Sequence, residues 1–269
     1  MEIITIMNTL PEYPKTPNPS NTSEADSQTT MCEVPVFMHG VESVLFGFNF
    51  RRSVLTKSQQ AYALVRRAIV THELPSNVPL DEGLLLEHFA CGRTPLREAL
   101  KRLSFESLLV WSPRQAPMIR DVGLYEMQHL YTTRRILEYE VAILAAERAT
   151  DEDIERMNTF RTQLSEASQA GLVYEAVELD FGLHSAIARA TQNRFLVEAS
   201  DNLNLQSLRL WFRAQNEHGV FTIDKMHSEL VSAISQHDTQ RARELTAAHI
   251  DSSFSRQQLL TTGGASTLR

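Results

Sequence analysis

The strongest constraint on the fold is that no proline follows Pro117. Apolar residues recur at helical spacing over most of the chain that follows. The candidate helices are residues 124–148, 151–168, 172–191, 194–215, 223–236 and 239–258. Because an internal proline breaks the helical hydrogen-bond ladder, this proline-free stretch is typical of an all-α bundle. We therefore expect a mainly α protein with a six- or seven-helix bundle over residues 123–260 and a flexible tail over 261–269.

The stretch of residues 56–122 has a different pattern. Helical spacing begins at Lys57, a short helix is expected around Asp81–Phe89, and Thr94-Pro95 is expected to supply the N-cap and first residue of a third helix. Two apolar segments that flank Pro113–Pro117 predict a short hairpin. This order of elements predicts a winged helix-turn-helix, a unit that places one helix in the major groove of DNA.

Residues 1–55 are expected to form a disordered arm. The first thirty residues combine four prolines with the polar tract SNTSEADSQTT, a composition that buries too little apolar surface to fold. No apolar run in the chain reaches the ~18 residues that a membrane span needs, so no membrane partner is expected. Two cysteines cannot form a disulfide framework, which is typical of a reducing cytoplasm.

The charge of the chain is distributed unevenly. The net charge is -7, but residues 1–50 carry -5, residues 51–122 carry +4 and residues 123–269 carry -6. A basic segment between acidic ones can meet phosphates while its flanks limit indiscriminate binding to polyanions. The alternative is that this distribution is ordinary scatter.

Basic residues gather on the predicted third helix and at the hairpin tip. The candidate DNA contacts are Arg93, Thr94, Arg97, Lys101, Arg102 and Arg114. Arg93 and Arg97 are the strongest candidates, because a guanidinium can hold a guanine edge or a phosphate through two hydrogen bonds. Lys101, Arg102 and Arg114 are expected to add attraction to phosphates. The alternative is a solvated basic face on an ordinary helix.

The spacing from Tyr62 to Ile119 resembles the N-terminal domain of the GntR family of bacterial transcription regulators, and RTPLREAL (93–100) is its most specific part. The resemblance implies binding to double-stranded DNA. A homodimer on a palindromic operator is expected, because one recognition helix contacts only a few base pairs. The chain departs from the family pattern at Gly92, where a serine is usual, and at the wing tip, which lacks the usual glycine.

Four ligand-type side chains in the second half share helical faces with apolar residues. Asp180 and His184 stand one turn apart, and His227 and His249 follow apolar neighbours by helical steps. Burying such groups is costly unless they are paired or bound to a metal. The pattern leaves two alternatives, a metal site and core histidines satisfied by hydrogen bonds. Imidazole and carboxylate ligands suit Zn²⁺, Ni²⁺ or Mn²⁺ and do not choose among them.

Arg134 lies on the apolar stripe of the predicted helix 124–148. A guanidinium on such a face needs an anion, which is either a buried carboxylate or an anionic ligand. The sequence leaves both alternatives open.

The second half is similar to the FCD ligand-binding domain of the FadR branch of the GntR family. The matching stretches are LYTTRRILEYEVAILAAERAT (130–150), LDFGLHSAIARATQNRFL (179–196) and MHSELVSAISQHDTQRARELTAAHI (226–250). The resemblance implies that Asp180, His184, His227 and His249 bind the metal and that a small organic acid binds the metal and Arg134 together. The weaker candidates for contact with this effector are Tyr131, Asn193, Arg209 and Arg213.

These features predict a ligand-responsive transcription regulator, a cytoplasmic repressor without enzymatic activity. One alternative is a metal-dependent enzyme that acts on a small carboxylate through the Asp/His site. Another is a scaffold whose helix-turn-helix no longer binds DNA, which the departures at Gly92 and Ala116 suggest.

Overall fold

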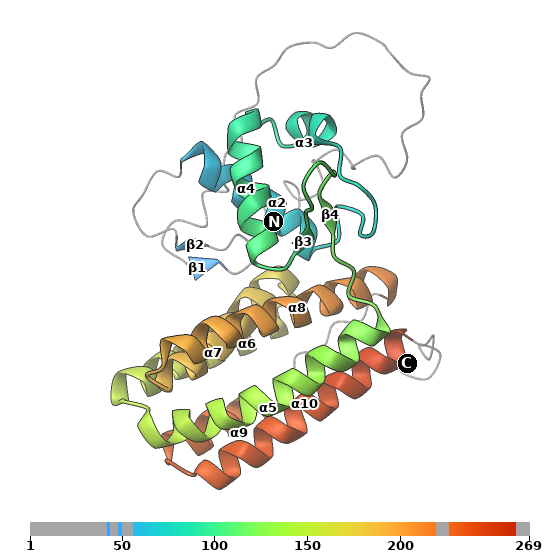
Figure 1. The fold of residues 1–269 in the computed structure, drawn as a ribbon. Helices are drawn as coiled ribbons and strands as arrows, with labels where there is room; N and C mark the ends of the chain where they lie inside the picture. Colours follow the sequence, from blue (N-terminus) through green and yellow to red (C-terminus); the bar gives the residue numbers. More distant parts are fainter. Residues whose placement is uncertain (1–41, 44–47, 50–55, 219–225, 262–269) are drawn as a thin grey trace. The chain divides into compact units, whose positions relative to one another are not determined.

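The computed structural model describes residues 42–43, 48–49, 56–218 and 226–261. The chain divides into two compact units, Met1–Asp121 and Val122–Arg269 (Figure 1). The prediction of a mainly helical protein, with a helix-turn-helix followed by an all-α bundle, is confirmed.

Part of the predicted arm has regular structure. Two short strands, β1 (Glu42–Ser43) and β2 (Phe48–Asn49), pair in antiparallel register. The structure describes only these strands within residues 1–55, and the disorder expected for that arm stays a prediction. The rest of that arm and the expected tail from residue 262 onward lie outside the described residues.

The first helices of the N-terminal unit begin at side-chain caps. Helix α2 (Lys57–Val70) starts at Thr56, whose hydroxyl accepts from the Gln59 backbone N–H while the Gln59 side chain accepts from the Thr56 backbone N–H. Helix α3 (Glu82–His88) starts at Asp81, whose carboxylate accepts from the Leu84 backbone N–H. These caps satisfy N–H groups that have no partner within the helix.

Helix α4 (Arg93–Phe105) begins two residues earlier than expected. Its N-cap is Gly92, whose carbonyl accepts the first helical hydrogen bond from Leu96, and not Thr94. Pro95 therefore stands third in the helix. The first turn tolerates proline there because its N–H groups lack partners within the helix, so the Thr-Pro pair alone does not fix the first residue. The predicted inward residues of this helix are fully buried: Leu96, Leu100 and Leu103.

The predicted hairpin follows α4. Strands β3 (Leu109–Val110) and β4 (Met118–Ile119) are antiparallel, with Leu109 opposite Ile119. At the tip, the Gln115 N–H donates to the Ser112 carbonyl. Arg114 adopts a left-handed conformation with φ of 63°. This is a backbone conformation that glycine adopts more readily.

Two basic residues of α2 are buried in ion pairs inside this unit. Arg66 lies 3.4 Å from the Glu106 carboxylate, and Arg67 lies 2.8 Å from that of Glu73. Both arginines are buried. Part of the positive charge of residues 51–122 therefore stabilises the fold and is not presented to solvent.

The described part of the second unit consists of six helices. They are α5 (Leu124–Arg148), α6 (Asp151–Gln169), α7 (Val173–Ala190), α8 (Arg194–His218), α9 (Met226–Ser235) and α10 (Thr239–Thr261). The predicted helix ends lie within three residues of these bounds. Residues 219–225, which include the expected start of the helix over residues 223–236, are not described.

The bundle helices pack as close antiparallel neighbours, with α5 beside α10 and α6 beside α7 (Figure 1). Gly182 allows the close approach of α7 to α6, because a Cβ atom at this position would lie 2.4 Å from Cε1 of Phe160. The core of the bundle is rich in alanine, which also brings helix backbones together. The shared core fixes the rotation of each helix and so directs the side chains of the site.

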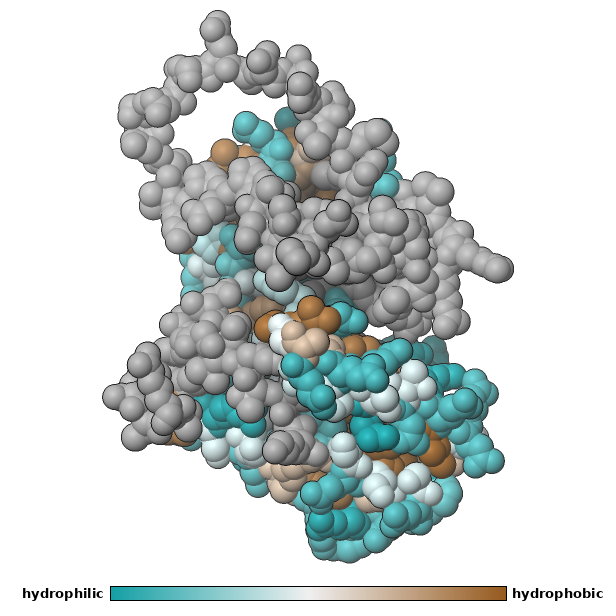
Figure 2. Space-filling model, turned by 180° about the vertical axis from the view of Figure 1, so that it is seen from behind, coloured by the Kyte–Doolittle hydropathy of each residue, from teal (hydrophilic) through white to brown (hydrophobic). Residues whose placement is uncertain are grey.

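The visible surface of the described bundle residues is largely hydrophilic, with scattered hydrophobic side chains (Figure 2). None of the helices described here combines the length and the apolar character needed to cross a membrane.

Candidate functional site

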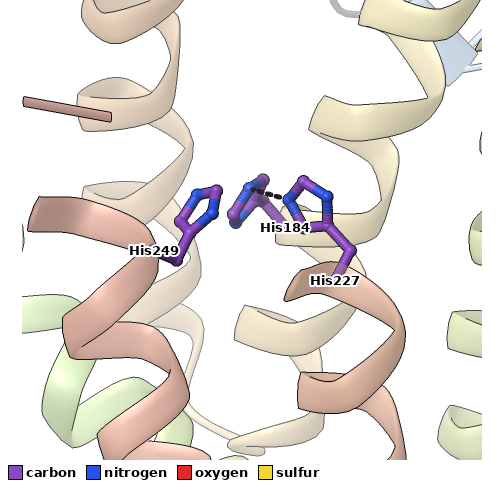
Figure 3. Close-up of side chains that lie close together, drawn as sticks. All are labelled: His184, His227 and His249. Carbon is purple, nitrogen blue, oxygen red and sulfur yellow. Dashed lines mark hydrogen bonds between the residues drawn. The ribbon is translucent and has the colours of Figure 1, made fainter. Parts of the chain in front are cut away.

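Three imidazoles from three helices meet inside the bundle. His184 on α7, His227 on α9 and His249 on α10 point toward one another (Figure 3), and one nitrogen of each lies within 4.8 Å of the others. A hydrogen bond of 3.3 Å joins Nε2 of His227 to Nε2 of His184. The three rings are thus arranged as potential ligands of one metal ion.

Asp180 lies one turn before His184 on α7 and completes the cluster. Its Oδ1 atom is 3.3 Å from Nε2 of His227, and its Oδ2 atom is 4.0 Å from Nε2 of His184. Two ligand atoms that share an ion at about 2.1 Å lie roughly 3.0–3.4 Å apart. The closest contacts of the cluster already have this spacing, so the donor set fits a divalent ion. All four residues expected as metal ligands are brought together here.

The protonation of the cluster favours metal binding. Burial lowers the pKa of His184 well below its usual range, although the nearby Asp180 carboxylate acts in the opposite direction. Burial alone would raise the pKa of Asp180, but the three surrounding imidazoles lower it below its ordinary value. A neutral imidazole and an ionised carboxylate are the forms that bind metal ions.

The cluster forms part of the wall of a cavity of about 90 Å³. Helices α5 and α7–α10 all contribute to this wall. Besides the four predicted ligands, its polar lining residues are Arg134, Asn204, Ser207, Trp211, Ser253, Arg256 and Gln257. The cavity is large enough for several water molecules or one small organic molecule.

Arg134 lines this cavity, but a carboxylate of the same helix compensates its charge. Its Nε donates to Glu138 over 2.5 Å and its NH2 donates to the other Glu138 oxygen over 3.2 Å, while its NH1 donates to Ser207 over 2.8 Å. Burial alone would lower the pKa of Arg134, but the adjacent Glu138 carboxylate raises it above its usual range. Of the two anions that the sequence allowed, the structure contains the buried carboxylate.

The weaker effector candidates do not line this cavity. Tyr131 is fully buried and its hydroxyl lies 2.7 Å from Ser253 Oγ. Asn193 accepts from the Phe195 backbone N–H at the start of α8. Arg209 donates to Gln206 over 2.9 Å, and Arg213 donates to the Val122 carbonyl over 3.4 Å. These contacts give the four side chains structural roles, so the prediction that they contact an effector has no support from the cavity wall.

Sequence reasoning missed several lining residues. Asn204, Ser207 and Trp211 lie on one face of α8, and Ser253 and Arg256 follow His249 by one and two turns on α10. The helical step from His249 was the available signal, because residues one and two turns away share its face. On α8, no residue was used to mark which face is turned inward, although Asp201 lies one turn before Asn204.

In the N-terminal unit, α4 presents the expected basic edge. Arg93, Thr94, Arg97 and Lys101 are exposed, and three of them are basic residues spaced by four. The Arg97 side chain is 57% exposed and forms an ion pair of 3.1 Å with Glu82 at the start of α3. This edge has the charge and access that contact with a DNA duplex requires.

The other two predicted DNA contacts have different surroundings. Arg102 lies over the ring of Tyr62, with 3.7 Å between its guanidinium carbon and the ring centroid, and it pairs with Glu106 over 3.2 Å. Arg102 is thus held against α2. Arg114 is exposed at the hairpin tip, which a hydrogen bond from Trp111 Nε1 to the Gln115 carbonyl closes.

Comparison with known protein families identifies both units. Residues 57–119 match the model of bacterial regulatory proteins of the gntR family, and residues 129–252 match the model of the FCD domain. The chain belongs to the GntR family. It is a GntR-family transcription regulator that carries an FCD domain, as the sequence resemblance implied. A GntR helix-turn-helix implies DNA binding, and an FCD domain implies a small-molecule effector.

This GntR-family chain matches most of the length of two curated relatives. The Nta operon transcriptional regulator of Aminobacter aminovorans is 25% identical over 179 residues, which is 65% of this chain and 82% of the relative. The HTH-type transcriptional repressor RspR of Escherichia coli is 21% identical over 194 residues, which is 72% of this chain and 85% of the relative.

A solved structure shows the same fold. Escherichia coli McbR/YncC superposes with a TM-score of 0.62 at 21% sequence identity, and the match covers 76% of this chain and 98% of that protein. This similarity concerns the fold of the GntR-family chain alone.

Proposed function

We propose that this GntR-family regulator is a metal-dependent repressor whose FCD bundle senses a small organic acid. In this proposal Asp180, His184, His227 and His249 bind one divalent ion, and the acid binds beside the ion in the cavity. Residues 56–122 form the DNA-binding domain and residues 123–260 the effector-binding and dimerisation domain. The protein acts as a homodimer on a palindromic operator, because two-fold symmetry doubles the sequence that is read.

One observation carries the metal and effector proposal. The carboxylate of Asp180 and three imidazoles converge in the wall of a cavity of about 90 Å³. A divalent ion bound there would supply a Lewis acid to which a carboxylate oxygen can coordinate. Since Asp180 contributes one negative charge, the ion and its ligands keep a net positive charge. This charge favours an anionic effector over a neutral one.

Charge in the rest of the wall supports the same class of effector. Arg134 and Glu138 form a neutral ion pair. The Arg134 guanidinium can therefore donate a hydrogen bond to an effector without adding net charge to the wall. Arg256 adds a second guanidinium to the lining. Asn204 and Ser207 lie nearby and can donate hydrogen bonds to a carboxylate.

The DNA side of the proposal rests on α4. Arg93, Arg97 and Lys101 are aligned on one exposed edge, and Thr94 lies beside them in the first turn. An effector controls binding only if its affinity differs between bundle arrangements that space the two recognition helices differently. The name of the relative RspR as a repressor supports repression as the direction of control.

The alternative of a metal-dependent enzyme has less support. Such an enzyme needs a general base beside the activated water. Among the described residues that line the cavity, Asp180 and the three histidines are the carboxylate and imidazole groups, and all four are assigned to the ion. Glu138 lies nearby but is bound to Arg134.

The proposal is tested by measuring the affinity of the protein for one DNA duplex in three states of metal and acid loading. A specific duplex is selected from random sequences with the purified protein, and its affinity is measured at fixed salt with metal-stripped, Zn²⁺-loaded and Zn²⁺-plus-acid protein. We expect about one equivalent of metal per chain by elemental analysis and a change of operator affinity by roughly 5- to 150-fold with an active acid. Exposed His129 is the matched control, since its replacement by alanine should change neither quantity. Metal content that is the same in wild type and in His184→Ala would overturn the metal assignment.

A further inference from the structure

A second, smaller chamber adjoins the effector cavity. It shares His184, Asn204 and His249 with that cavity and has a volume of about 20 Å³. Helices α5 and α7–α10 enclose it. The polar wall residues that it does not share with the larger cavity are Glu138 on α5, Ser200 on α8 and Thr246 on α10. The chamber therefore lies next to two of the predicted metal ligands but has hydroxyl groups of its own.

The two hydroxyls are buried and lack a hydrogen-bond partner within the described residues. Ser200 is 2% exposed and Thr246 is 4% exposed, and neither Ser200 Oγ nor Thr246 Oγ1 has a partner there. Helical serine and threonine often bond back to the preceding turn, and these two do not. An unsatisfied buried hydroxyl is costly, so a pair of them in one chamber indicates that something polar binds between them.

The volume of the chamber and the polarity of its wall limit which group can bind there. A volume of about 10–15 Å³ is enough for one water molecule, so 20 Å³ accommodates one oxygen and not a whole organic acid. Most of the remaining wall is apolar: Val141, Ala142, Ile187 and Leu230. Glu138 also lines the chamber, but its carboxylate is paired with Arg134, so the wall offers no free charge to compensate an ion. The suitable group is a neutral one that both donates and accepts a hydrogen bond.

We propose that this chamber, bounded by Ser200 and Thr246, is a subsite for one neutral oxygen that both donates and accepts a hydrogen bond. The oxygen belongs either to a resident water or to a hydroxyl group of the effector. The second source rests on the proposed function and identifies the effector as a small hydroxy acid. Its carboxylate would then stay in the larger cavity while its hydroxyl enters the chamber past the shared wall of His184, Asn204 and His249.

The first test is the direction of a stability change in the full-length protein without added metal or acid. Thr246→Val removes one hydroxyl at constant volume, and Ser200→Ala removes the other. If an oxygen is bound, both variants lower the melting temperature, and a high-resolution crystal structure of the wild type shows an oxygen within hydrogen-bond distance of both side chains. Thr246→Ser keeps the hydroxyl and should retain that oxygen. Ser232→Ala removes an exposed serine hydroxyl from α9 and is the matched control.

A rise in the melting temperature of these variants would have the opposite meaning. If the chamber is empty, replacing an unsatisfied hydroxyl by a methyl group raises the melting temperature, and no oxygen is seen between the two residues. That outcome would exclude a resident water, and the inference would be overturned if the double variant in the second test also leaves the preference for glycolate unchanged.

The second test separates the two sources of the oxygen. Calorimetry on Zn²⁺-loaded protein compares acetate with glycolate, which differ by one hydroxyl. If the effector supplies the oxygen, the preference for glycolate falls about tenfold in the Ser200→Ala/Thr246→Val double variant. If water supplies it, the double variant leaves the ratio of the two affinities unchanged while the crystallographic oxygen remains in the wild type. Failure of both acids to bind, with that oxygen present, would contradict the proposed effector class but support the chamber with water as its occupant.

Discussion

Arg97 on α4 and Glu82 on α3 form an ion pair at the basic edge, with Nε of Arg97 3.1 Å from Oε2 of Glu82. The pair links the two helices of the helix-turn-helix and holds the guanidinium in a defined direction. An exposed pair of this kind contributes only about 0.2–1 kcal/mol, so a phosphate or a guanine edge can displace the carboxylate. Glu82 therefore competes with DNA for the residue expected to read it.

Removing this competitor should strengthen DNA binding. We expect Glu82→Gln to raise affinity for a duplex a few-fold at low salt, because the Arg97 charge is no longer compensated. Gel-shift titrations at several salt concentrations measure this gain. Glu126→Gln makes the same change of charge at an exposed position on α5. An equal gain in both variants would mean that only net charge matters.

Loss of Arg97 should have the opposite effect. Arg97→Ala is expected to lower affinity for the specific duplex by roughly 1–3 kcal/mol or more and to reduce the difference between specific and random DNA. Circular dichroism and melting temperature should stay at wild-type values, since the side chain is exposed. Arg156→Ala on α6, which also breaks a surface ion pair, is the control. Wild-type affinity in Arg97→Ala would exclude this residue from the DNA interface.

Removal of one partner of the buried Arg134–Glu138 pair should lower the free energy of unfolding strongly. Glu138→Ala leaves a buried guanidinium without its carboxylate and is expected to cost about 3–5 kcal/mol in the free energy of unfolding by urea. The double variant Arg134→Met/Glu138→Leu should recover most of this loss, because an apolar pair of similar volume needs no compensation. Asp251→Asn breaks the more exposed pair with Arg135 and should cost less than about 1 kcal/mol. Equal costs for the two single variants would contradict the buried pair.

Metal binding should be linked to stability. At a free Zn²⁺ concentration of about 1,000 times Kd, a site present only in the folded state adds about 4 kcal/mol. We expect Zn²⁺ to raise the melting temperature of the stripped wild type and a chelator to reverse the rise. His184→Ala should lose most of this response, whereas His129→Ala should keep it. A Zn²⁺ response of wild-type size in His184→Ala would place the metal elsewhere.

Gly182 should be intolerant of even one methyl group. Gly182→Ala is expected to destabilise the bundle by about 1–3 kcal/mol, because its Cβ atom would overlap the Phe160 ring. A double-mutant cycle with Phe160→Ala tests the cause, since removing the ring should abolish most of the additional cost. Additive costs would show that contact with the Phe160 ring is not the cause, since helix propensity alone favours alanine over glycine.

Local patterns were sufficient to place the helices of this protein to within a few residues and to find much of its site. Helical spacing placed α5 at residues 124–148, the bounds that the structure gives. The same spacing put Asp180 and His184 on one inward face, and both lie in the cluster. The start of α4 was misplaced by two residues, because Gly92 and Thr94 are both compatible with a proline in the first turn.

By itself, the sequence determined which residues form helices and which side chains turn inward, because both depend on neighbours within one or two turns. Only the tertiary structure decided which inward residues meet. Tyr131 and Arg209 are buried as side chains of long helices, yet they do not line the cavity, while Asn204 and Arg256 do. The physical reason is that a cavity lies where several helices meet, so its lining depends on the rotation and crossing of each helix against the others.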